Sequence, residues 1–314
     1  MAHVGRAVVA GDLGGPEVLQ VVEVETPAPG PGEVVVRVDA AGVNPWDWKS
    51  YAPGSGTRTP VRLGLEVAGV VQAVGPGVRW YSPGDDVVAW PVTGGYADLV
   101  TVPQHVLVRR PARLDVVPAA GLLAAGVTAA HAVAATGVDD EDVVLVHGAS
   151  GGVGRMAVQL AVLRGARVVA TASPAWHECL RRLGAEPVAY GPGLLDRVRT
   201  VEGTVGRVSV AIDAVGTAEA LDTSAALVAD RRRVATLVAL DRAAGLGVLA
   251  LGHGPGADPG ADVRDAARSQ LTALAADGSL DVLVTGTFPL EDAAAAHRRS
   301  REGHAGGKLV LTTR

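Results

Sequence analysis

The chain has 314 residues, which is long enough for two domains that each bury a sizeable core. Its composition is 48% hydrophobic and 19% charged, and a net charge of -5 argues against nucleic acid or an anionic membrane as partner. Cys179 is the single cysteine, which excludes an intrachain disulfide and any multi-cysteine zinc site. The N-terminal residues lack the apolar core of a signal peptide, so we expect a cytoplasmic protein.

The first hundred residues indicate short strands broken by turn signals such as the Pro- and Gly-rich stretch 27–32, a pattern typical of a β-rich, barrel-like domain. The expected strands are 6–10, 20–25, 34–40, 67–74, 86–90 and 97–102. Residues 116–138 carry no charge, but Ala and Gly dominate them and aromatic anchors are missing. A buried helix is therefore favoured there over a membrane span.

From about residue 117 onward, apolar strands alternate with helical segments, as in a parallel sheet. The expected strands are 143–147, 168–172, 187–190, 207–212, 233–239 and 281–285. The Gly-rich stretch 241–262 indicates a loop, a helix is expected to open at 288–292, and a last strand covers 308–312. The sequence thus predicts an α/β protein with a β-rich domain at 1–117, completed by 287–314, and a doubly wound domain at 118–286.

Residues 143–163 carry the strongest motif of the chain. A buried apolar strand stops at a glycine-dense turn, and an amphipathic helix follows. Ala149, Gly151 and Gly154 have the spacing of the G-x-G-x-x-G fingerprint, with Ala in the first position. This order lets the backbone approach a pyrophosphate while the first N–H groups of the helix face it. The strand 168–172 completes a β-α-β unit, which favours a nicotinamide cofactor.

The end of that second strand bears on which cofactor is bound. NAD-specific sites place an acid there to accept the ribose 2′-hydroxyl, but this chain has no acid before Glu178. The missing carboxylate permits the 2′-phosphate of NADPH, so we expect NADPH rather than NADH.

Seven segments resemble, in order, the zinc-independent quinone oxidoreductase branch of the medium-chain dehydrogenase/reductase superfamily. They are GGPEVLQVVEVETPAPGPGEVVVRVDAAGVNPWDWK (14–49), GLEVAGVVQAVGPGV (64–78), GDDVVAW (84–90), GGYADLVTVP (94–103), HGASGGVG (147–154), LGAEPVAY (183–190) and AHRRSREGHAGGKLVL (296–311). The resemblance covers nearly the whole chain. It implies a Rossmann-type doubly wound parallel sheet plus a GroES-like barrel domain to which the tail returns. Relatives commonly form dimers, so a homodimer is expected.

The resemblance also implies that no metal is bound. The positions that match the catalytic zinc ligands of the superfamily's alcohol dehydrogenases are Asn44, Leu65 and Ala124, which lack the thiolate and imidazole groups that zinc prefers. Without a Lewis acid, the expected chemistry is hydride transfer to an activated acceptor.

Residue by residue, the resemblance implies a set of cofactor contacts. They are Thr128, Ser150, Gly151, Gly152, Val153, Ser173, His177, Tyr190 and Lys308. Backbone N–H groups come from 151–153, Ser173 is the phosphate contact, and His177 stands where a lysine is often found. Ala175 departs from relatives that carry an arginine there. Lys308 is one of only two lysines in the sequence. The alternative to a cofactor contact is that Lys308 is an exposed surface side chain.

Asn44 and Tyr51 are the predicted catalytic residues. The amide of Asn44 can orient the nicotinamide or a substrate carbonyl, or else form a turn before Pro45. Tyr51 is the predicted proton donor, with Tyr81, Tyr96 and water as alternatives, and with packing as its structural alternative. A further pair, Trp46 and Trp48, is predicted to line the substrate site unless it belongs to the core.

The function expected from these residues is NADPH-dependent hydride transfer to a quinone or to the conjugated C=C of an enone, with a natural-product pathway as one setting. A small molecule is the expected partner. Two alternatives stay open: carbonyl reduction or a redox-neutral reaction in the same pocket, and NADPH binding without turnover.

Overall fold

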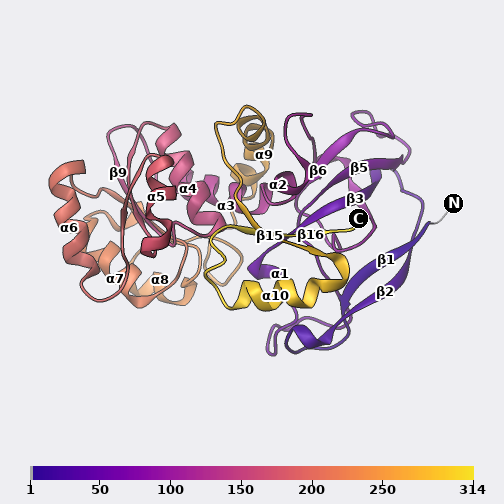
Figure 1. The fold of residues 1–314 in the computed structure, drawn as a ribbon, viewed down its shortest axis with the longest axis horizontal. Helices are drawn as coiled ribbons and strands as arrows, with labels where there is room; N and C mark the ends of the chain where they lie inside the picture. Colours follow the sequence, from indigo (N-terminus) through magenta and orange to yellow (C-terminus); the bar gives the residue numbers. More distant parts are fainter. Residues whose placement is uncertain (1–2) are drawn as a thin grey trace. The chain divides into compact units, whose positions relative to one another are not determined.

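The computed structural model describes residues 3–314, which divide into two compact units. One unit contains the chain up to Ala124 together with Ser269–Arg314, and the other contains Ala125–Arg268. These borders differ from the predicted 117 and 286, and the predicted domain boundaries stay a prediction. The C-terminal strand β16 (Lys308–Thr312) pairs with β3 (Glu33–Val43), so the tail joins the sheet that contains β3 (Figure 1).

The first unit contains two sheets. One has the strand order β15-β16-β3-β5-β6-β8, with β7 also paired to β3, and the other has the order β2-β1-β4. The remaining strands are β1 (His3–Ala10), β2 (Leu19–Thr26), β4 (Val61–Arg62), β5 (Val67–Val74), β6 (Asp86–Ala89), β7 (Leu99–Pro103), β8 (Leu107–Arg109) and β15 (Val284–Pro289). Short helices α1 (Pro45–Lys49) and α2 (Val116–Ala120), and the C-terminal helix α10 (Ala293–Arg301), complete it.

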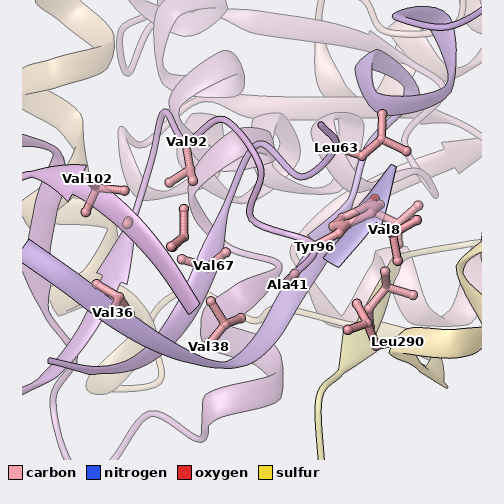
Figure 2. Close-up of a cluster of buried hydrophobic side chains, with 14 of the residues drawn as sticks. Val8, Val36, Val38, Ala41, Leu63, Val67, Val92, Tyr96, Val102 and Leu290 are labelled. Carbon is pink, nitrogen blue, oxygen red and sulfur yellow. The ribbon is translucent and has the colours of Figure 1, made fainter. Parts of the chain in front are cut away.

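Alternating valines such as Val34, Val36 and Val38 contribute to the core of the first unit, and the central strand β3 is also buried on its other face at Val35. Figure 2 shows Val36, Val38 and Val67 pointing into this core, and Tyr96 lying near Val8. This packing favours one register, since a slip by one residue would exchange the side chains of the two faces of a strand.

The second unit is built on a parallel six-stranded sheet of order β11-β10-β9-β12-β13-β14. This is the doubly wound order, and it confirms the predicted Rossmann-type sheet. The strands are β9 (Val143–His147), β10 (Arg167–Thr171), β11 (Ala185–Val188), β12 (Val210–Asp213), β13 (Val234–Thr236) and β14 (Leu249–Ala250). Its helices are α4 (Gly152–Leu163), α5 (His177–Arg182), α6 (Leu194–Val205), α7 (Ala218–Leu227) and α8 (Leu240–Leu246). The borders of the unit fall within α3 (Leu123–Ala135) and α9 (Ala261–Ala276).

Four predicted segments are wrong in detail. The strand expected at 281–285 in the doubly wound sheet is β15, which pairs with β16 in the first unit. The stretch 116–138 is two helices, α2 and α3, because Gly121 ends the first one. The expected loop at 241–262 contains α8, whose Ala-rich turn closes at Gly247 in the left-handed conformation. The helix expected from 288 begins later, because pairing with β16 extends β15 to Pro289.

Within residues 3–314, no helix combines the length and apolar character needed to cross a bilayer.

Candidate active site

The turn between β9 and α4 requires glycine at two positions. Gly148 adopts a positive φ of 69°, which L side chains rarely adopt. A Cβ on Gly154 would lie 2.2 Å from the carbonyl oxygen of Gly148, so only glycine lets the helix pack this closely on the turn. The fingerprint therefore brings the start of α4 directly onto the end of the central strand.

The start of α4 presents three backbone donors. The first bond within the helix is donated by the N–H of Arg155 to Gly151, and among residues 3–314 the N–H groups of Gly152, Val153 and Gly154 have no partner. The N–H of Gly151 donates to the carbonyl of Gly148 at 3.0 Å. The prediction that Gly151 offers a free N–H is therefore wrong, because that donor closes the turn. Ser150 lies half-buried in the same turn.

Four strand ends form one row at the carboxyl edge of the sheet. In register, they are Thr171 of β10, His147 of β9, Asp213 of β12 and Thr236 of β13. The imidazole of His147 lies between the hydroxyls of Thr171 (3.2 Å) and Ser224 (3.0 Å). Burial lowers the pKa of His147 to about 4, so the imidazole is neutral and has a structural role here.

Asp213 and Thr236 hold the loops that follow β12 and β13. One oxygen of Asp213 accepts the N–H groups of Val215 (3.0 Å) and Gly216 (2.8 Å), and the other accepts the hydroxyl of Thr236 at 2.7 Å. The Thr236 oxygen in turn accepts the N–H of Ala239 at 3.1 Å. The loops at this edge are thus fixed by side chains of the sheet itself.

The end of β10 carries the predicted nucleotide-selecting residues. Ser173 is half-buried and precedes a short 3-10 turn, and the Nε2 atom of His177 lies 3.2 Å from the carbonyl oxygen of Ala172. Glu178, the first acid, is exposed and lies 3.8 and 3.7 Å from two arginines on its own helix. Tyr190 is 49% exposed beyond β11, and Thr128 is half-buried in α3.

In the first unit, strand pairing brings three distant polar residues together. Lys308 begins β16, Asn44 directly follows β3, and Glu66 directly precedes β5. Because β16 and β5 both run antiparallel to β3 on either side of it, these three residues meet at one end of the sheet.

These three residues form a buried cluster. The Nζ atom of Lys308 donates to Asn44 Oδ1 at 2.6 Å and to Glu66 Oε1 at 2.7 Å. The side chains of Lys308 and Glu66 are only 6% and 2% exposed, so the pair is buried and the exposed-lysine alternative is wrong. The second oxygen of Glu66 accepts the N–H of Ala124 at 2.8 Å. A Cβ on Gly42 would lie 2.3 Å from Glu66 Oε1, so the cluster also depends on this glycine.

The hydrogen-bond inventory of the cluster shows what it can offer a ligand. The Asn44 amide nitrogen already donates to Glu66 and to the carbonyl of Gly42. Its Oδ1 accepts from Lys308 and faces the backbone N–H of Asp47 in the capping box of α1, and Lys308 has one N–H left after its two bonds among the described residues. The cluster can therefore donate one hydrogen bond to a ligand through Lys308.

The remaining predicted site residues lie apart from this cluster. Tyr51 is fully buried, and its hydroxyl bonds to His297 Nδ1 at 2.8 Å. The indole of Trp48 donates to Ser300 at 3.2 Å, whereas Trp46 is 52% exposed. The geometry favours the packing alternative for Tyr51 and Trp48, and the predicted roles of all three residues stay predictions.

Comparisons with known proteins identify the family. Residues 30–112 match the alcohol dehydrogenase GroES-like domain, and residues 183–311 match the zinc-binding dehydrogenase family. The chain is 32% identical to a 2-haloacrylate reductase from a Burkholderia species, over 97% of this chain and 98% of that protein. The chain belongs to the quinone oxidoreductase branch of the medium-chain dehydrogenase/reductase superfamily.

Solved structures agree with this membership. The quinone oxidoreductase of Pseudomonas syringae pv. tomato is 31% identical with a TM-score of 0.84, over 98% of this chain and 99% of that one. A mycobacterial protein in complex with NADPH is 29% identical with a TM-score of 0.83, over 98% and 99%. Against the Arabidopsis thaliana chloroplast envelope quinone oxidoreductase homolog, at 36% identity, the chain spans 57% of that protein's length. The predicted GroES-like fold and family are thereby confirmed.

As a member of this branch, the chain has an NAD(P)-binding dehydrogenase fold, and the three N–H groups at α4 fit a pyrophosphate. Zinc does not fit the residues present. The carbonyl oxygen of Asn44 and one oxygen of Glu66 are bound by the Lys308 ammonium, and Leu65 and Ala124 supply no ligand side chain. Within residues 3–314 no three His, Cys, Asp or Glu residues gather as a metal-binding group.

Two parts of the site were missed by sequence reasoning. The sequence does not single out Glu66, because its pairing with Lys308 depends on contacts across 242 residues. Asp47 lies inside α1 and accepts the N–H of Asn44 at 2.8 Å. The signal for Asp47 was its place three residues after Asn44, the spacing of a capping box.

Proposed function

We propose that the protein is an NADPH-dependent, zinc-independent reductase that transfers hydride to a quinone or to the conjugated C=C of an enone. The observation that carries this proposal is the fingerprint turn, whose three unpartnered N–H groups at α4 meet no competing side chain. Relatives named quinone oxidoreductase and 2-haloacrylate reductase support an activated acceptor, since an acrylate also has a conjugated C=C.

The residues that would hold NADPH follow from the second unit. Gly152, Val153 and Gly154 would bind the pyrophosphate, and Ser173 and His177 would receive the 2′-phosphate at the end of β10. NADPH is proposed over NADH because no carboxylate stands at that strand end to repel the phosphate. Ser150, Thr128 and Tyr190 are further proposed contacts.

The bound cofactor supplies a hydride, and the protein supplies orientation and electrostatics. We assign the remaining N–H of Lys308 to the oxygen on which negative charge develops, and we assign Asn44 to the placement of that ammonium. Glu66 keeps Lys308 in place. Water is the proposed source of the proton on carbon, because the Tyr51 hydroxyl is bound to His297.

An oxidation assay with both reduced cofactors tests the proposal. NADPH loss at 340 nm would be measured with quinones, enones and aldehydes, and deuterium from [4-²H]NADPH would be located in the product. We expect faster turnover with NADPH and deuterium at the β-carbon of an enone. Turnover of aldehydes alone would establish carbonyl reduction instead, and stoichiometric binding without turnover would establish a non-catalytic protein.

A further inference from the structure

A second buried polar chain in the first unit has no place in the proposed mechanism. It consists of Asp47, Tyr96, His297 and Tyr51, none of which is more than 2% exposed. The Tyr96 hydroxyl lies 3.0 Å from Asp47 Oδ2 and 3.2 Å from His297 Nε2, and His297 Nδ1 lies 2.8 Å from the Tyr51 hydroxyl. Tyr51 and His297 also stack with their rings 8° from parallel.

Asp47 receives three donors at one end of this chain. They are the backbone N–H of Asn44 (2.8 Å), the backbone N–H of Gly64 (3.2 Å) and the hydroxyl of Tyr96 (3.0 Å). Only an ionised carboxylate accepts all three without a competing proton of its own. The backbone of Asn44 is therefore anchored by a charge, while its side chain reaches Lys308 and Glu66.

The ionised form of Asp47 also sets the direction of the whole chain. The only proton of Tyr96 goes to Asp47, so its oxygen accepts from the Nε2–H of His297. The imidazole is neutral, because burial lowers the pKa of His297 to about 4, and its bare Nδ1 then accepts the proton of Tyr51. Each proton in the chain is used once, and Tyr51 has none left for a substrate.

We propose that Asp47 is a positioning residue for Asn44, and that Tyr96, His297 and Tyr51 hold its carboxylate in the accepting state. The inference rests on the proposed function in one respect, the use of Asn44 and Lys308 toward the acceptor. Independently of that function, the bond from the Asn44 backbone to Asp47 determines where the Asn44 amide meets Lys308.

The buried polar residues have a second hydrogen-bond arrangement, which protonation of Asp47 would select. Burial raises the pKa of Asp47 to about 6, although Tyr96, the two backbone N–H groups and Lys308 oppose this. The other groups facing the chain are Glu66 toward Tyr96, Glu17 toward Tyr51, and Arg301 toward Tyr51 and His297. A protonated Asp47 donates to Tyr96, Tyr96 then donates to Nε2 of His297 in its Nδ1–H tautomer, and Nδ1–H donates to Tyr51. The neutral carboxyl accepts the N–H groups of Asn44 and Gly64 more weakly than the carboxylate does.

The sequence provides a direct probe, because Asn44 is the only asparagine in the chain. Protein labelled with [¹⁵N]asparagine gives one backbone N–H signal, the donor to Asp47, and one side-chain NH₂ pair, the donor to Glu66 and Gly42. In the wild type we expect both signals to shift together with pH, with a midpoint near 6. Asp47→Asn adds a second asparagine, whose signals are identified in the double variant that also carries Asn44→Ala. The Asn44 signals of D47N are expected not to titrate.

Tyr96→Phe removes only the hydroxyl donor and guards against a poorly folded D47N. It should raise the midpoint, whereas Tyr81→Phe, which loses a hydroxyl bond to the Leu107 carbonyl, should leave the Asn44 signals unshifted. An unchanged midpoint in Y96F, or a backbone signal that titrates while the NH₂ pair stays still, would overturn the inference.

Kinetics separate this inference from the proposed function. D47N should lower kcat at least about tenfold with little change in the KM for NADPH, and should have no further effect in an Asn44→Ala background. Additive losses in the double variant would overturn the positioning role. A wild type without any turnover would refute the proposed function alone, and the Asn44 signals would still decide whether Asp47 positions that residue.

Discussion

Replacing Lys308 by methionine tests the buried cluster most directly. Methionine keeps the length and packing of the stem but removes the charge, which leaves the Glu66 carboxylate 2% exposed without a cation. Removing one partner of a buried pair costs about 3–5 kcal/mol, a large share of a stability of about 5–15 kcal/mol. Glu66 would keep only its bonds from the Asn44 amide and the Ala124 N–H.

The double variant K308M/E66Q separates a lost contact from a stranded charge. Neutralising Glu66 removes the uncompensated carboxylate, so the double variant should be more stable than K308M alone by about 2 kcal/mol or more. Urea denaturation followed by circular dichroism at pH 7.5 measures these differences. Lys49→Met is the matched control, because Lys49 is the only other lysine and is exposed over the ring of Trp48.

We expect K49M to unfold close to the wild-type urea midpoint. If K308M loses no more stability than K49M, Lys308 is solvated and the assignment of its ammonium to Glu66 and Asn44 fails. If K308M/E66Q is instead less stable than K308M, the cost comes from packing and the charge argument is refuted.

Three further outcomes follow from the same structure. Gly154→Ala should abolish NADPH binding measured by calorimetry, because the new Cβ would collide with the Gly148 carbonyl. The control Gly203→Ala has open space around its Cβ in α6, so it should bind NADPH normally and gain about 0.5–1 kcal/mol of stability. Ser173→Asp should weaken NADPH at least about tenfold relative to NADH in the same assay, and equal effects on both would contradict a 2′-phosphate contact. The pKa of Asp47 in the folded protein lies above its ordinary 3.8, so the contribution of Asp47 to stability is lost as pH rises through 6. The stability advantage of the wild type over D47N should therefore fall by about 2 kcal/mol between pH 4.5 and 7.5. A difference that stays constant with pH would show that Asp47 does not titrate in this range.

Local patterns carried most of what the sequence predicted correctly. The fingerprint at Ala149, Gly151 and Gly154 requires only a strand, a turn and a helix that are contiguous in the chain. The buried strands were found because their alternating or continuous apolar residues reflect burial directly. Segment order then sufficed for the family, and the strand order of the second unit followed from it.

The polar clusters could not be predicted, because the pairing and register of distant strands decide which polar residues meet. Lys308 meets Asn44 across 264 residues and His297 meets Tyr51 across 246, and no local pattern records which strands pair. The bond between the Tyr51 hydroxyl and His297 is hidden from the sequence for the same reason, so the position of Tyr51 after α1 could not distinguish a proton donor from a packing residue. Gly151 was misjudged for a smaller reason: its N–H turns inward to the Gly148 carbonyl.

The two clusters meet at Asn44, and this explains why an amide suits that position. Its side chain lies beside the negative Glu66 and its backbone is anchored by the negative Asp47, with Lys308 as the one cation bonded to the group. A carboxylate at position 44 would add a third negative charge against one ammonium, and a thiolate or imidazole would compete for the oxygen that Lys308 occupies. The uncharged amide of Asn44 accepts from Lys308 through its oxygen and donates to Glu66 through its nitrogen, so it satisfies both residues. In this cluster the Lys308 ammonium and a metal ion are therefore competing ways to balance the charge of Glu66, and the chain has adopted the ammonium.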